Sequence, residues 1–413
     1  MNEFSSRVKN FPIRVLLGFL LATELLFFVA PQQWQVENYL GVELYLALMN
    51  VALWAGYARG VKSRRVLFPQ DKVDFRVVKW LILIALPMMM VQLYWAFGTL
   101  NPASIFTSVQ QGITDSGAAY SARKSDVNLT LYALNSLMSP VIFYAFALGS
   151  FAFRRLPKKY RFILLALIAM ELSKWLSIGV RKGVMDMIIT LLAGYVAGNY
   201  QLLENRRKLA RAAVAMGSVV AIFIAYFLIS NLSRYSQESF ATAAANYSPT
   251  GVYAHLPSWL LFPIYSISGY LCQGYYALAK ALEVGFIQPD LLATNFFTVN
   301  VAERFGINPL ENSYMDILQS RFGIDTFSNW HSIYVWLANG FTFAGVPLFI
   351  YAVGYLFGQS WILSIRQNAL RAVPMFVILA QMIFYFFANN QIFSFSFPTI
   401  IILMLLYFSK IRL

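Results

Sequence analysis

The sequence predicts an all-α integral membrane protein that crosses the bilayer about ten times and carries a long, ordered outside loop. Three observations lead to this fold class. Of the 413 residues, 59% are hydrophobic and only 12% are charged, whereas soluble domains carry about 25% charged residues. Apolar runs of bilayer length recur along the chain, and lysine and arginine gather in alternate connecting segments. This composition excludes an ordinary soluble enzyme, a disordered chain and a nucleic-acid-binding domain.

Ten apolar runs are long enough to cross a bilayer. A spanning helix needs roughly 17–25 apolar residues, because within lipid every backbone amide must be satisfied inside the segment. The runs cover approximately residues 13–31, 39–57, 77–97, 129–153, 161–179, 184–200, 211–231, 332–359, 372–388 and 391–409. The first run follows basic residues as a signal peptide would, but Pro31 directly after Ala30 argues against cleavage. We therefore expect a retained anchor and a single membrane domain over residues 1–413.

Basic residues test this topology independently, since lysine and arginine accumulate in loops on the cytoplasmic side. With the N-terminus inside, 23 of the 32 basic residues lie in cytoplasmic segments, and every alternate loop agrees. Both termini are thus expected in the cytoplasm. Lys174 falls inside a span, and eight basic residues remain outside: Arg123, Lys124, Arg181, Lys182, Arg234, Lys280, Arg304 and Arg321. Cations kept outside against the general bias suggest an anionic ligand.

Two outside segments are longer than ordinary connectors. The first covers residues 98–128, and the second covers residues 232–331 between spans seven and eight. Loops of this length in compact proteins are usually functional or disordered, and the many aromatic residues of the second favour order. Its apolar stretch 259–282 would reverse every later loop if it crossed once. Because Pro257, Pro263, Gly269 and Gly274 interrupt it, we expect short re-entrant or interfacial helices there.

Few ionisable residues lie inside the predicted spans, and each is a candidate for function. Glu24 falls near the middle of the first span, either as a buried carboxylic acid or as part of a site. Glu171 and Lys174, three residues apart on the fifth span, share a helix face and can neutralise each other.

The densest group of polar residues lies at the outside tip between spans five and six. Gly179 and Gly183 permit a tight turn, and Arg181 and Lys182 then stand at the N-terminus of span six. A helix N-terminus adds free amides and a positive dipole, and arginine holds phosphate oxygens with a planar fork. The tip is therefore suited to a phosphate group, with Asp186 placed to orient one cation; a basic pair reaching lipid headgroups is the alternative.

A second group closes the long loop, where His331 precedes the eighth span. Histidine can accept a proton from an attacking hydroxyl near neutral pH without a metal or cofactor. Glu311, Asp316 and Asp325 are the reserve bases. The chain has no P-loop, Rossmann glycine pattern, metalloprotease motif or Asp-x-Asp signature, and its single cysteine, Cys272, excludes a disulfide framework. We expect no metal and no cofactor.

These features resemble the O-antigen polymerase and O-antigen ligase group of membrane-embedded GT-C glycosyltransferases. The resemblance rests on the many-span layout, the tip Gly179-Val180-Arg181-Lys182-Gly183, one large late outside loop, and the run from His331 through Asn339-Gly340 to Gly345. An arginine followed eleven residues later by glycine, found in some polymerases, does not occur at the outside arginines. Ten spans are also fewer than relatives often have.

The resemblance implies a substrate of undecaprenyl pyrophosphate that carries an oligosaccharide, handled at the periplasmic face of a bacterial inner membrane. It implies an inverting, metal-independent glycosyltransferase in which Arg181 binds pyrophosphate and His331 acts as the base. Lys182, Arg123, Arg234, Arg304 and Arg321 are further pyrophosphate ligands by position. Membrane lipids and a chain-length regulator protein are the expected partners, and no nucleic acid is expected.

Two alternatives to a polymerase stay open at this stage. A ligase would move finished polysaccharide to a lipid A core, and His331 favours it. A lipid or polysaccharide transporter is the rival from another class. Transporters are typically built from related halves with ionisable residues near the midplane, whereas this chain has no apparent repeat and its unexplained cations lie outside.

Overall fold

The computed structural model describes residues 4–63, 74–119, 129–234, 251–326, 329–367, 369, 371–390 and 401–402. Over these residues the regular structure is helical. The long helices are α1 (Ser6–Val29), α2 (Tyr39–Lys62), α3 (Phe75–Phe97), α6 (Leu129–Ala152), α7 (Lys158–Ser177), α8 (Arg181–Gly198), α9 (Arg206–Arg234), α11 (Ser258–Val284), α14 (Ser332–Gln367) and α15 (Ala372–Phe384). The shorter helices are α4 (Pro102–Thr114), α12 (Phe296–Glu303) and α13 (Tyr314–Phe322).

Six helices of the described chain are long and apolar enough to cross a membrane: α1, α2, α3, α6, α9 and α14. This supports the predicted polytopic membrane protein. Three further predicted spans coincide with α7, α8 and α15. Charged side chains make α7 and α8 less apolar, and α15 is a shorter apolar helix of 13 residues. The tenth predicted span, 391–409, lies almost wholly outside the described residues.

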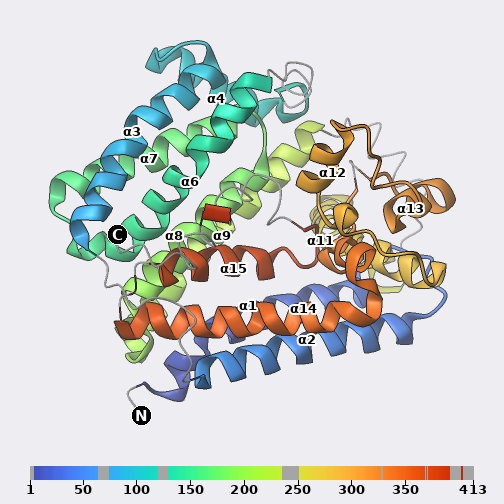
Figure 1. Cartoon of the computed structure of the whole chain (residues 1–413). Coiled ribbons are helices and arrows are strands. Elements are labelled where there is room, and N and C mark those ends of the chain that lie inside the picture. The colour runs from blue at the N-terminus through green and yellow to red at the C-terminus, as the bar shows by residue number, and fades with distance from the viewer. Residues whose placement is uncertain are drawn as a thin grey trace.

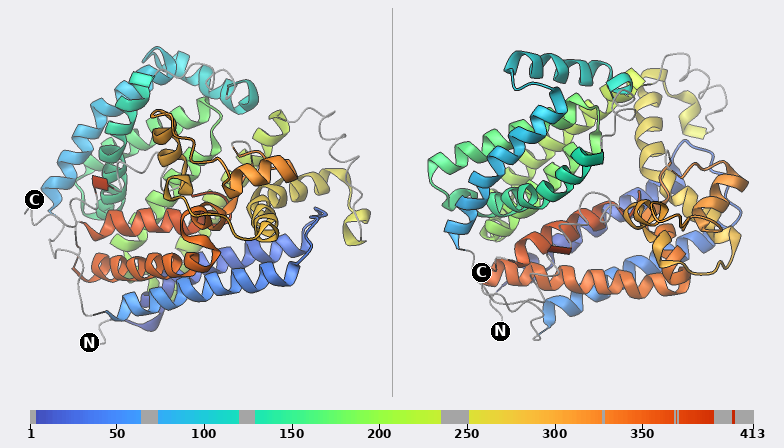
Figure 2. Two further views of the ribbon diagram at one scale, coloured as in Figure 1. Left: turned by 45° about the vertical axis from the view of Figure 1, so that its right-hand side comes forward. Right: turned by 45° about the horizontal axis from the view of Figure 1, so that its top comes forward.

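The helices form two groups with α8 between them. Helices α1, α2, α14 and α15 lie alongside one another in the lower part of Figure 1, and α3, α4, α6 and α7 form the upper group. The two further views separate the same groups (Figure 2). Helix α8 contacts α6 and α7 on one side and α14 and α15 on the other. Helices α11, α12 and α13 gather at the end of the molecule where α14 begins.

Polar caps define where several helices begin. Asn38 accepts a hydrogen bond from the Gly41 amide at 2.8 Å at the start of α2. Asn101 accepts one from Ala103 at 3.0 Å at the start of α4, whose first residue is Pro102. Such caps satisfy amides that have no partner inside the helix, and each contributes about 1 kcal/mol.

Helices α2 and α14 pack closely against each other, and glycines on both helices make this possible. A Cβ atom at Gly56 would lie 2.0 Å from the Tyr351 carbonyl oxygen, and one at Gly60 would lie 2.1 Å from that of Tyr355. Conversely, a Cβ atom at Gly354 would lie 2.3 Å from the Leu53 carbonyl oxygen of α2, and one at Gly358 would lie 2.5 Å from that of Tyr57. Two G-x-x-x-G patterns therefore meet, an arrangement that lets helices associate closely where lipid offers no hydrophobic driving force.

The stretch 259–282 was predicted to break into short pieces, and that prediction is wrong. It forms one continuous helix, α11, with Pro263 near its start. Gly274 does not end the helix but permits close packing, because a Cβ there would lie 1.9 Å from the Phe387 carbonyl oxygen. Pro263, the sixth residue of α11, removes one helical hydrogen bond without ending the helix.

The predicted eighth span is interrupted. Thr342 has a non-helical backbone with φ of 58° and ψ of 161°, so α14 consists of two helical pieces joined by a kink. The first piece is deeply buried, and Trp336 and Tyr334 are among the largest fully buried side chains. This buried piece directly follows His331 in the chain.

Candidate functional site

The turn between α7 and α8 is shaped by Gly179. Its φ of +68° lies in the left-handed region, and a Cβ atom there would lie 2.6 Å from the Ser116 carbonyl oxygen. Both the dihedral angle and the close approach favour glycine. The turn ends α7 at Ser177 and starts α8 at Arg181, so the predicted placement of a basic pair at a helix N-terminus is found.

Arg181 is buried at this helix N-terminus, with 7% of its surface exposed. Its Nε–H group donates a hydrogen bond to Ser230 Oγ at 2.9 Å. The guanidinium carbon lies 4.8 Å from the centroid of the Phe227 ring. Both contacts come from α9. A cation held beside the first amides of a helix is an arrangement suited to an anionic oxygen ligand.

Lys182 forms an ion pair with Asp186 one helical turn along α8, with Nζ and Oδ2 2.6 Å apart. The ammonium group also lies 5.5 Å from the centroid of the Tyr385 ring, beyond the end of α15. The expectation that Asp186 orients one of the cations is met, and the cation is Lys182. The Arg181 side chain is instead directed to α9.

His331 is fully buried directly before α14. Its backbone N–H donates to Asn389 Oδ1 at 3.0 Å, and its Nδ1 lies 3.0 Å from the Asn329 carbonyl oxygen. A carbonyl only accepts, so we assign the ring proton to Nδ1. Nε2 then carries a lone pair, and it has no hydrogen-bond partner among the described residues.

Burial lowers the pKa of His331 from 6.5 to about 4. The Asn329 and Ile324 backbone and the Asp325 carboxylate act in the opposite direction, and burial prevails. The imidazole is therefore neutral at pH 7, as a general base must be.

The backbone beside His331 is strained. Ser332 has a φ of +57°, which is costly for a residue with a Cβ, and it is fully buried. Its Oγ has no partner among the described residues. Strained backbone of this kind is found disproportionately at functional sites. The strained residue Ser332 directly follows His331, whose Nε2 has no partner among the described residues.

Aromatic side chains connect the Arg181 and His331 regions. The Phe227 ring lies 5.0 Å from Tyr270, and Tyr270 lies 5.4 Å from Trp330, the residue before His331. The segment after α15 provides a second connection, since Tyr385 lies beside Lys182 and Asn389 bonds to His331. Helices α8, α9, α11, α14 and α15 thus bring the two predicted groups into one region.

Other predicted site residues lie elsewhere. Arg304 is exposed at the end of α12, and Arg321 is exposed in the last turn of α13. Glu311 is exposed before α13, whereas Asp316 accepts a long hydrogen bond from the Asn312 amide at 3.3 Å. Of the reserve bases, only Asp325 acts on His331. Arg123 lies outside the described residues, and only the backbone of Arg234, the last residue of α9, is described.

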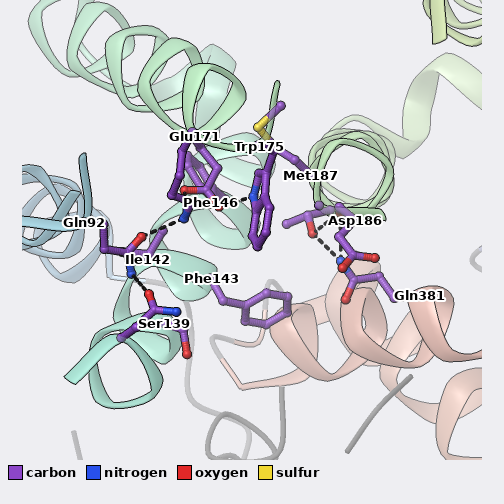
Figure 3. A pocket seen from close by; sticks show the side chains of 14 residues that line it. Gln92, Ser139, Ile142, Phe143, Phe146, Glu171, Trp175, Asp186, Met187 and Gln381 are labelled. Carbon is purple, nitrogen blue, oxygen red and sulfur yellow. Dashed lines mark hydrogen bonds and ion pairs between the residues drawn. The ribbon is translucent and has the colours of Figure 1, made fainter. Parts of the chain in front are cut away.

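A cavity of about 120 Å³, lined by both apolar and polar side chains, lies beside Asp186 between α3, α6, α7, α8 and α15 (Figure 3). Lys174 and Glu171 form an ion pair of 2.6 Å there, as their spacing predicted. Lys174 also donates to Gln92 at 2.7 Å, and the Trp175 indole donates to Glu171 at 2.6 Å. Each charge that lines the cavity is therefore matched by an opposite one.

Several of these residues were not foreseen. Gln92 and Gln381 each interrupt an apolar run, and Gln381 donates to Thr190 at 2.7 Å across α8 and α15. The sequence position of Asn389 did not indicate its contact with His331, although an Asn-Asn pair after an apolar run is unusual. A search for amides inside predicted spans would have found Gln92 and Gln381, since polar groups in lipid require partners. It would have missed Asn389, which directly follows the predicted span 372–388.

The chain was compared with known proteins, and no family model, no curated protein and no solved structure matches it. Among the described residues, no three His, Cys, Asp or Glu side chains come together as ligands of a metal ion would.

Proposed function

We propose that the protein is an O-antigen polymerase, which transfers a growing polysaccharide from undecaprenyl pyrophosphate to a lipid-linked repeat unit. The observation that carries this proposal is that Arg181 and His331 lie in one region of the molecule. Arg181 is a buried guanidinium at a helix N-terminus, and His331 is a neutral histidine whose Nε2 has no partner among the described residues. The rings of Phe227, Tyr270 and Trp330 connect them, from the Arg181 guanidinium to the residue before His331.

Arg181 and Lys182 are the cations that would stabilise the departing pyrophosphate. Pyrophosphate departs readily, so the protein mainly has to position it and stabilise the negative charge that develops on its oxygens. Arg181 and Lys182 stand on the first turn of α8, where the helix dipole adds to their charge. Asp186 keeps the Lys182 ammonium in place at 2.6 Å.

His331 supplies the base for inversion. Its Nε2 accepts the proton of the acceptor hydroxyl as that oxygen bonds to the anomeric carbon of the donor. The bond between this carbon and the pyrophosphate oxygen breaks on the opposite side, and undecaprenyl pyrophosphate leaves. Because the Asn329 carbonyl engages Nδ1 at 3.0 Å, the basic nitrogen is fixed as Nε2.

The proposed topology keeps ten spans, with both termini in the cytoplasm of a bacterium and the α7–α8 turn at the periplasmic face of its inner membrane. The distribution of basic residues supports this orientation. Both α8 and α14 then begin outside, so the pyrophosphate site and the base face the compartment in which repeat units are joined.

Deletion of the gene, followed by gel analysis of lipopolysaccharide, tests the proposal. We expect caps of a single repeat unit in place of the ladder, and the plasmid-borne gene should restore the ladder. Loss of all attached polymer, with polymer accumulating on the carrier lipid, would identify a ligase. An unchanged ladder would exclude both activities. Purified protein with lipid-linked repeat units should then form longer chains without added nucleotide sugar.

A further inference from the structure

Arg181 is covered in this structure, and the cover has two sides. One side is the end of α9, which contacts Arg181 through Ser230 and Phe227. The other is Ser116, which follows α4 and bonds to Ser230. Ser230 Oγ donates to Ser116 Oγ at 2.8 Å, and Ser116 Oγ donates to the Ser230 carbonyl at 3.0 Å. Both serines are fully buried, and Phe227 is 6% exposed. A ligand that binds the Arg181 guanidinium must therefore displace part of this cover.

The Ser116 side is held tightly. A Cβ atom at Gly112 on α4 would lie 2.2 Å from the Leu176 carbonyl oxygen, and one at Gly179 would lie 2.6 Å from that of Ser116. Backbone therefore packs directly on backbone between α4, residue 116 and the α7–α8 turn. Dense packing of this kind resists displacement.

Helix α9 is held loosely by comparison. Only 6% of the residues in its apolar span are buried, against 67% in that of α6. No side chain between Arg206 and Tyr226 is buried, and burial begins at Phe227. Regions with few buried contacts open at the lowest free energy. The end of α9 is thus the side of the cover that moves.

The surface of α9 also indicates what enters there. Large apolar side chains stand exposed along it: Val214, Val219, Val220, Ile222, Ile224 and Ile229. The same helix ends on the buried Arg181 guanidinium. An apolar surface that leads to a cation complements an amphiphile with a hydrocarbon chain and an anionic phosphate headgroup.

We propose that α9 is a lateral gate, through which the phosphate headgroup of a lipid reaches Arg181 from the bilayer while its chain lies along α9. Opening separates Ser230 from Ser116 and from Arg181, and the lipid phosphate takes the place of the Ser230 hydroxyl on the guanidinium. This inference rests on the proposed function, because it concerns the route of the lipid-linked substrate.

The double variant Ser116→Cys/Ser230→Cys tests the gate. Because the two hydroxyl oxygens are 2.8 Å apart, cysteines at these positions lie within reach of a disulfide, whose sulfur atoms are about 2 Å apart. Binding of undecaprenyl pyrophosphate is measured by native mass spectrometry, before and after reduction with dithiothreitol. Both single-cysteine variants serve as controls, and Cys272 is present throughout. Reduction removes the lock from the same molecules, so misfolding is separated from locking.

We expect the oxidised double variant to bind the lipid at least about tenfold more weakly, since locking removes the binding-competent state, and reduction to restore binding. Inorganic pyrophosphate should be excluded in the same way. Equal binding by oxidised and reduced protein would refute the gate while leaving the proposed function intact. Failure of the disulfide to form would contradict the contact on which the gate rests. If wild-type and reduced proteins bind neither ligand, the proposed function fails first and the gate fails with it.

Discussion

The ion pair between Glu171 and Lys174 gives a quantitative prediction about stability. The two side chains are 8% and 6% exposed, with Nζ and Oε2 2.6 Å apart. We consider Lys174→Met, which keeps the aliphatic stem, and Glu171→Gln, which keeps the shape of the side chain and an oxygen for the Trp175 indole. Each single variant leaves one buried charge without its partner.

The magnitude follows from that orphaned charge. Removing one member of a buried pair typically costs about 3–5 kcal/mol. Trp175 still donates to the Glu171 carboxylate in the first case, and Gln92 still accepts from the Lys174 ammonium in the second. We therefore expect the lower end, about 3 kcal/mol each. Replacing both members removes both charges, and such replacements are often neutral. The double variant should therefore be more stable than either single variant.

The assay is unfolding of the purified protein in mixed micelles as the fraction of sodium dodecyl sulfate rises, followed by tryptophan fluorescence. The double-mutant cycle isolates the pairwise interaction. Single variants that are each destabilised, with a double variant close to wild type, would agree with the prediction. A double variant that loses the sum of the two single losses would refute the reasoning, because the two charges would then contribute independently.

Two further predictions concern packing and pH. Gly60→Leu should destabilise the fold by about 2 kcal/mol or more in the same unfolding assay, since a Cβ there would lie 2.1 Å from the Tyr355 carbonyl oxygen. Gly217→Leu is the matched control, because nothing lies within 4 Å of its Cβ position, and equal losses would contradict the close contact. Because burial lowers the pKa of His331 to about 4, the base stays neutral on acidification, and transfer rates should hold from pH 7.5 to about pH 5. A loss of activity with a midpoint near pH 6.5 would show an unperturbed histidine instead.

Periodic features of the sequence predicted much of the fold. Apolar runs located the long helices, since lipid leaves a spanning chain few alternatives to a helix. The helix-face argument for Glu171 and Lys174 also succeeded, because residues three apart are neighbours on any helix. These predictions depend only on local geometry.

Features that depend on tertiary contacts were not predictable in this way. Glycines in the stretch 259–282 suggested breaks, yet Gly274 serves packing against Phe387. The kink at Thr342 was not predicted, although Gly340 and Gly345 flank it, because the apolar run by itself predicts one continuous span. Arg181, Lys182 and Asp186 lie at the start of one helix, as their sequence spacing predicted, because they are close together in the chain. Ser230 and Asn389 are distant in the chain, and no spacing rule connects them to the start of that helix.

The most direct test of the central claim is the rate of polysaccharide transfer by the purified Arg181→Ala variant, with lipid-linked repeat units as substrate. We predict a loss of about 10²–10³-fold, as for removal of one preorganised donor to a developing anion. Arg181→Lys should retain part of the rate, because it keeps the charge but loses the planar fork. Arg304→Ala is the matched control, since Arg304 is exposed at the end of α12, and it should behave as wild type. A folded Arg181→Ala protein with the rate of wild type would contradict the account.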